Sequence, residues 1–115
     1  MTADELIAIE TALDIQLREA YRATVTSADL ILPQEMFTEV QTIIGTNLGY
    51  RRNSWLGRPL DRVLFVFGRD RNGNALFMDL DIIEPIIFSA DHSRKCGKVE
   101  ARSFDEWFSR HAQAA

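Results

Sequence analysis

The chain has 115 residues, one cysteine and a formal net charge of −4. This length is typical of one domain that can bury a core, and a lone cysteine excludes an internal disulfide. The N-terminal stretch is acidic where a signal peptide would be basic, and no run approaches the roughly 20 apolar residues that span a bilayer. We therefore expect a single cytoplasmic domain over residues 1–115 that does not associate with membranes.

The first 32 residues predict helices. Thr2 followed by Glu5 is a capping-box pattern, in which each side chain accepts from the other residue's backbone N–H. Three apolar residues then share one helical face: Leu6, Ile9 and Leu13. A second periodic set follows: Leu17, Tyr21 and Thr24. Asp14 stands between the two sets, which favours a break near residues 13–16.

The stretch LPQEMFTEVQTIIG, residues 32–45, predicts a further helix. Pro33 suits the first helical turn, where its missing N–H is no loss, and Gly45 is a natural C-terminal cap. The apolar stripe of this helix would be Met36, Val40 and Ile43 or Ile44. Residues 46–61 contain glycines and a proline without a clean period, which is typical of a loop.

Three strands are predicted next, over residues 63–67, 75–82 and 85–89. The first is apolar throughout, which suits a strand covered on both faces. The second alternates, so that Asp79 and Asp81 would share one face. Between these two strands, Asn72-Gly73 is a strong hairpin signal because both residues accept positive φ. We therefore expect Asp70–Asn74 to be a turn, whatever else these residues do.

The chain is expected to end in a helix. Ser103 and Glu106 repeat the capping-box spacing. Aromatic residues and a histidine follow at helical spacing: Phe104, Trp107, Phe108 and His111. Helices followed by strands and one last helix predict an α+β fold, in which an antiparallel meander packs with N-terminal helices and a C-terminal helix.

No residue pattern predicts catalysis, a cofactor or a metal site. Gly68 and Gly73 do not form a nucleotide-binding fingerprint, and the two histidines lack the spacing of metal ligands. Asp91 and His92 could form an acid–base pair, but neighbouring residues on an extended segment point to opposite sides. We expect a protein that is not an enzyme and that holds no cofactor and no metal.

The best candidates for contact with a partner are acidic or lie at loop tips. The acidic and hairpin residues are Asp70, Asn74, Asp79, Asp81, Glu84 and Asp91. They could meet a basic protein, or they could belong to a sheet face that is only solvated, which is commoner. Trp55 lies in a polar loop among arginines, where it could anchor a protein, stack on a single-stranded base or fold back on the core.

The sequence resembles the SUKH superfamily, whose Smi/Knr-type domains occur in fungal cell-wall regulators and bacterial toxin-immunity proteins. The stretch LFVFGRDRNGNALFMDLD looks like the family's strand, turn and second strand that ends in an acid. The residues that carry this match are Gly68, Asp70, Gly73, Asn74, Leu76 and Asp79. EPIIFSADHS is similar to the family's next strand, ARSFDEWF to its closing helix and IETALDIQLREAYRA to its opening helices.

The chain departs from the family pattern at three places. Arg18 stands where the family commonly has proline, the glycine-rich turn is reduced to Asn72-Gly73-Asn74, and residues 46–61 match no family pattern. The resemblance implies an α+β domain whose sheet and loops form a protein-binding surface, and it implies no catalytic residue.

Three functions follow as hypotheses. The first is a bacterial immunity protein that binds and neutralises a cognate secreted toxin, such as a nuclease, by direct contact. The second is a regulatory or scaffold module that binds an endogenous protein. The third is a nucleic-acid or small-ligand binder that uses a basic loop: Arg51, Arg52, Trp55 and Arg58. The net negative charge counts against nucleic acid as the partner.

Overall fold

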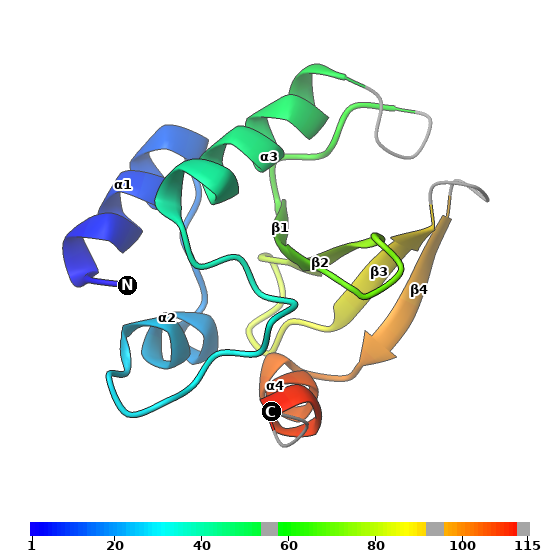
Figure 1. Ribbon diagram of the computed structural model, residues 1–115. Helices are drawn as coiled ribbons and strands as arrows, with labels where there is room; N and C mark the ends of the chain where they lie inside the picture. Colours follow the sequence, from blue (N-terminus) through cyan, green and yellow to red (C-terminus); the bar gives the residue numbers. More distant parts are fainter. Residues whose placement is uncertain (54–57, 92–95, 113–115) are drawn as a thin grey trace.

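The computed structural model describes residues 1–53, 58–91 and 96–112. Its elements in chain order are α1 (Ala3–Leu13), α2 (Glu19–Thr26), α3 (Val40–Arg52), β1 (Leu64–Arg69), β2 (Ala75–Asp79), β3 (Ile87–Asp91), β4 (Cys96–Ala101) and α4 (Phe104–Ala112). The strands form one antiparallel meander in the order β1-β2-β3-β4. The N-terminal helices α1 and α3 lie toward the β1 end of the sheet, and β4 forms the edge that is far from them (Figure 1). The predicted α+β fold is confirmed.

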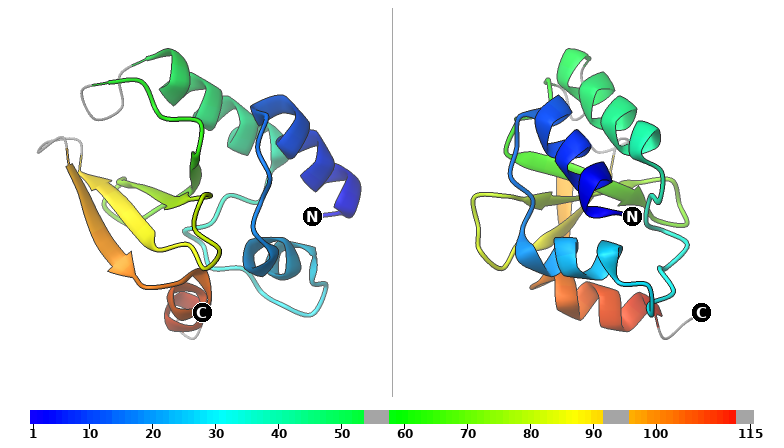
Figure 2. Two further views of the ribbon diagram at one scale, coloured as in Figure 1. Left: turned by 180° about the vertical axis from the view of Figure 1, so that it is seen from behind. Right: turned by 90° about the vertical axis from the view of Figure 1, so that its left-hand side faces the viewer.

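The sheet has apolar side chains on both faces, and two hydrophobic clusters result. The main cluster joins the helices to one face, which carries Phe65 and its register partner Met78. The second cluster lies on the opposite face, around Val66 and its partner Phe77. Figure 2 shows α1 running beside α3, and α2 beside α4. Both faces of β1 and β2 are therefore covered, which explains why β1 is apolar at nearly every position.

Both ends of the first predicted helix are confirmed. The Thr2 hydroxyl accepts from the Glu5 N–H, and the Glu5 carboxylate accepts from the Thr2 N–H, so the capping box is complete. Asp14 ends α1 in the left-handed conformation, with φ 53°. The chain has no regular secondary structure from Ile15 to Arg18, before α2 starts, which confirms the predicted break.

The helix predicted from Pro33 to Ile44 is wrong in position. The segment instead makes a turn at Gln34 and Glu35, and Met36 then forms a bridge with Gly68 at the outer edge of β1. The helix starts only at Val40 and continues to Arg52, through positions that were predicted to be loop. Gly45 is therefore inside α3 and is not its cap. Burial of Ile43 and Asn47 on one face of α3 outweighs the weak helix propensity of the glycines.

The second strand ends earlier than its alternating pattern predicts. β2 stops at Asp79, because the Asp79 carboxylate accepts from the Asp81 N–H and turns the chain. The Leu80 N–H then donates to the Val63 carbonyl across the end of the sheet, at 2.8 Å. Asp79 and Asp81 consequently do not share a strand face, and that expectation is corrected.

The hairpin between β1 and β2 is the tight turn that Asn72-Gly73 predicts. Gly73 has φ 81°, which costs glycine little. The Asp70 carboxylate accepts from the backbone N–H groups of Asn72 and Asn74, each at 2.9 Å, and from the Asn74 side chain at 3.2 Å. Asp70 is thus first the residue that builds the turn.

The meander contains a strand that the sequence did not predict. β4 pairs with β3, and Ala101 of β4 lies opposite Ile87. Glu100 is the extra residue of a β-bulge, since the register moves from Ala101–Ile87 to Val99–Phe88. The bulge and the glycine at position 97 hide the simple alternation by which a strand is recognised.

Replacing Tyr21 with phenylalanine is expected to stabilise the protein. Its ring packs edge-to-face on Phe65 at 5.4 Å and on Phe104 at 5.6 Å. Its hydroxyl is buried without a hydrogen-bond partner among the residues that the structure describes. Tyr21→Phe should raise the free energy of unfolding by roughly 1 kcal/mol, because a desolvated hydroxyl is removed and the ring stays.

The same substitution should change the alkaline unfolding of the protein. Burial raises the pKa of Tyr21 above its ordinary value near 10. The unfolded chain therefore ionises this tyrosine above about pH 10 while the folded chain does not, and stability falls as pH rises. Urea unfolding at pH 7 and pH 10.5 should show that the free energy of unfolding falls less in Tyr21→Phe than in the wild-type chain. A loss of stability at pH 7 would mean that the hydroxyl is bonded.

Candidate protein-binding surface

Three of the predicted contact residues meet at the hairpin end of the sheet. Asp70 and Asn74 come from the β1–β2 turn, and Asp91 comes from the end of β3, beside the Ala75–Ala90 pair. All three line a hollow of about 510 Å³. The hollow is also lined by Asn72, Ser89, Lys98 and Glu100. The meander therefore gathers residues that lie up to 30 positions apart, which the sequence indicated only for the hairpin.

The sequence did not mark Ser89, Lys98 or Glu100 as candidates, and two of these three residues contact each other. The buried Ser89 hydroxyl donates to the Glu100 carboxylate at 2.8 Å, across β3 and β4. No motif marks either residue, because their pairing depends on a strand that was not predicted. The hollow combines carboxylates, amides and one ammonium group, so it is polar without being uniformly acidic.

The other predicted acids lie at the opposite end of β2. Asp79 is the last residue of β2, and Asp81 and Glu84 belong to the connection from β2 to β3, which runs from Leu80 to Ile86. β2 separates them from the hairpin by its five residues, or about 17 Å of extended chain. The six candidate residues therefore form two groups and not one face.

The β2–β3 connection also exposes apolar side chains. Ile82 is 38% exposed and Ile83 is 81% exposed. They stand directly between Asp81 and Glu84, both of which are exposed. We call residues 81–84 the isoleucine loop. Asp79 lies beside this loop and holds its turn through the Asp81 N–H.

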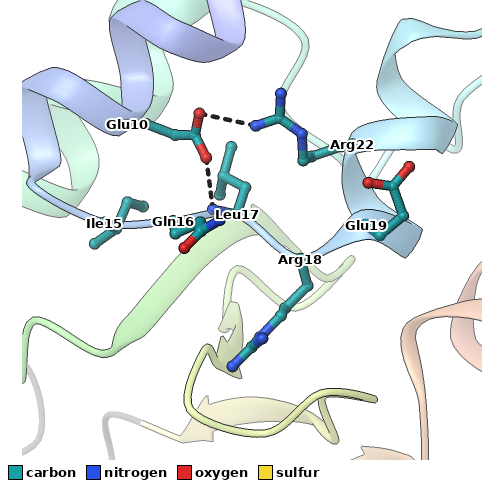
Figure 3. Close-up of a pocket in the computed structure, with 7 residues that line it drawn as sticks. All are labelled: Glu10, Ile15, Gln16, Leu17, Arg18, Glu19 and Arg22. Carbon is teal, nitrogen blue, oxygen red and sulfur yellow. Dashed lines mark hydrogen bonds and ion pairs between the residues drawn. The ribbon is translucent and has the colours of Figure 1, made fainter.

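A polar pocket of about 760 Å³ lies along the linker between α1 and α2 (Figure 3). The Glu10 carboxylate binds Arg22 at 2.8 Å and accepts from the Leu17 N–H at 2.9 Å, so it ties both helices to the linker. Arg18 points away from this pair in Figure 3, and its Nε donates to the Leu80 carbonyl at 2.6 Å. The linker is thereby fastened to the residue that precedes the isoleucine loop.

A smaller pocket of about 250 Å³ continues this depression toward the isoleucine loop. It shares Ile15, Gln16 and Arg18 with the first pocket and reaches Asp81. Arg62 lines it as well, and its guanidinium binds Asp14 at 2.6 Å. The isoleucine loop therefore stands at the rim of a polar depression.

One arginine of the basic loop that could bind nucleic acid, Arg51, instead holds two parts of the fold together. Arg51 donates to the Leu13 carbonyl at 2.7 Å and to the Arg62 carbonyl at 3.3 Å, so its guanidinium joins α3 to the end of α1. Burial, followed by the nearby charge of Arg62, lowers the pKa of Arg51. Arg52 and Arg58 are exposed. Trp55, like His92, lies outside the described residues.

Within the described ranges, no group of three or more histidine, cysteine or acidic side chains is placed to hold a metal ion. In the same ranges, no helix combines the length and apolar character needed to cross a membrane. Comparison of the chain with protein-family models, curated proteins and solved structures finds no match.

Proposed function

We propose that this chain is a bacterial immunity protein, which neutralises a cognate secreted toxin by binding it through the isoleucine loop. The observation that carries the proposal is the pair of exposed isoleucines, Ile82 and Ile83, enclosed by acids. Protein interfaces combine an apolar centre with a polar rim. An apolar side chain that is already exposed at a loop tip is suited to fill a pocket on a partner.

The charges around the loop favour a basic partner such as a nuclease. Asp81 and Glu84 flank the isoleucines, and Asp79 lies next to them. The whole chain also carries a net charge of −4. Complementary charge at the rim would raise the association rate and suppress wrong partners, while the isoleucines would supply most of the affinity.

Replacing Ile83 should weaken toxin binding. The toxin is first obtained as the protein that co-purifies with the tagged chain and stops growth when expressed alone. Ile83→Ser should then lower its affinity about tenfold or more, measured by calorimetry, because a central apolar anchor is lost. The matched control is Ile31→Ser. Ile31 is 79% exposed against 81% for Ile83, but it precedes Pro33 in another loop, so its replacement should change nothing.

Growth distinguishes the proposal from its alternative. Cells that express the toxin should grow with the wild-type chain or Ile31→Ser, and should be inhibited when Ile83→Ser is combined with Asp81→Lys. Equal protection by all variants would exclude the isoleucine loop as the contact. A bound protein that is harmless when expressed alone would exclude immunity and would support a regulatory or scaffold module.

A further inference from the structure

The two edges of the sheet are treated differently. The outer edge of β1 is closed: Asn47 bonds both backbone groups of Val66 at 2.9 Å, and the Arg69 N–H donates to the Glu35 carbonyl at 2.9 Å. The Phe37 N–H donates to the Phe67 carbonyl at 2.9 Å as well. Backbone groups of an edge strand bind other strands unless they are covered in this way.

The outer edge of β4 is open along most of its length. Gly97, Lys98 and Val99 are exposed, and within the described part of the chain their only hydrogen-bonded neighbour is β3. Glu100 differs, because its carbonyl accepts from Arg110 at 2.9 Å. Figure 1 shows β4 at the side of the sheet that faces away from α1, α2 and α3.

A row of apolar side chains crosses the sheet, and its last member is exposed at this edge. Register places Val66 opposite Phe77, Phe77 opposite Phe88, and Phe88 opposite Val99. The rings of Phe77 and Phe88 stack at 5.2 Å. Exposure increases along the row, from 0% at Val66 to 57% at Val99. The last side chain of the row therefore lacks a neighbour on its outer side within the described structure.

We propose that β4 pairs antiparallel with β4 of a second copy of this chain, about a two-fold axis at Val99. This register places Val99 opposite its own copy, so the apolar row continues across both sheets. It also places Lys98 of each copy opposite Glu100 of the other. Opposite charges that face each other across antiparallel strands stabilise the pair, and the two-fold axis creates this pairing twice.

The self-complementarity of Lys98-Val99-Glu100 is what favours a second copy over an unrelated strand. Pairing centred one residue earlier would set Lys98 opposite Lys98 and leave Val99 without its apolar neighbour. The proposed register requires Arg110 to release the Glu100 carbonyl, which costs one hydrogen bond while its bond to Glu106 at 2.8 Å can remain. The dimer is independent of the toxin, because β4 and the isoleucine loop are separate surfaces.

Charge exchange tests the register. Sedimentation equilibrium of the wild-type chain should show a monomer–dimer equilibrium. Lys98→Glu should weaken dimerisation roughly tenfold, because like charges then face each other twice. The double variant Lys98→Glu/Glu100→Lys restores both pairs and should recover the wild-type constant. A wild-type chain that stays monomeric to roughly 1 mM, or a double variant no better than Lys98→Glu, would overturn the proposal, with circular dichroism confirming that each variant is folded.

Disulfide trapping provides a second test that does not alter the charges. Residues opposite each other in an antiparallel pair have Cα atoms about 4.5–5.5 Å apart, within the range that a disulfide spans. In a Cys96→Ser background, Val99→Cys should form a covalent dimer on mild oxidation. Ile7→Cys is the matched control, since Ile7 on α1 is 54% exposed against 57% for Val99. Equal cross-linking of the two variants would overturn the proposed axis.

Discussion

Asn47→Ala is expected to lower the free energy of unfolding by about 4 kcal/mol. The Asn47 side chain is fully buried between α3 and β1. Its oxygen accepts from the Val66 N–H at 2.9 Å, and its nitrogen donates to the Val66 carbonyl at 2.9 Å. The variant leaves both backbone groups buried without partners, and each such group costs about 1–3 kcal/mol.

Two further variants separate the hydrogen bonds from the packing. Asn47→Leu keeps the number and branching of the side-chain heavy atoms and leaves no cavity, so a loss of similar size would assign the effect to the unpaired groups of Val66. Asn53→Ala is the matched control. Each asparagine donates to the carbonyl four residues earlier, Asn47 to Ile43 and Asn53 to Gly49, but Asn53 is exposed. Its replacement should cost less than about 1 kcal/mol. Urea unfolding measures all three, and a small effect of Asn47→Ala would mean that water replaces the amide.

Asn47 also explains why the sequence misplaces α3. An asparagine after Gly45 is typical of a helix end, and the sequence of residues 46–61 has the composition of a loop. The helix continues because the Asn47 side chain bonds the Val66 backbone of β1. Its nitrogen also donates to the Ile43 carbonyl of α3, at 2.8 Å. This gain depends on a strand 19 residues away, and local patterns cannot report it. The sequence located well those helix termini that have a side-chain cap, at Thr2 and at Ser103.

The candidate site was predictable to a similar degree. The hairpin turn follows from Asn72-Gly73 alone, so the position of Asp70 and Asn74 at a loop tip was predictable. The separation of Asp79 and Asp81 from the hairpin was not, because it depends on β2 ending at Asp79. The exposure of Ile83 was also hidden, since an isoleucine after an alternating strand is equally typical of a core residue.

Gly68→Ala is expected to destabilise the protein by about 3 kcal/mol. A Cβ atom on Gly68 would meet the Glu35 carbonyl oxygen and would lie 3.2 Å from the Met36 Cα. These are backbone atoms, and the same segment is held to β1 by the bond from the Arg69 N–H to the Glu35 carbonyl. The segment must therefore move away from the edge strand, which disturbs its two hydrogen bonds and the packing of Met36.

Gly45→Ala should have the opposite sign, and the contrast identifies close approach as the cause. Gly45 lies inside α3, and no atom beyond the local helix backbone comes within 4 Å of its added Cβ, so alanine should stabilise the helix by about 0.5–1 kcal/mol. Hydrogen exchange gives the local evidence: Gly68→Ala should speed exchange at the Phe37 and Arg69 amides, which bond across this edge. If Gly68→Ala were as stable as the wild type with both amides still protected, the segment could not be held against β1 as closely as the structure places it, because no room for the methyl group exists while Glu35 stays bonded to Arg69.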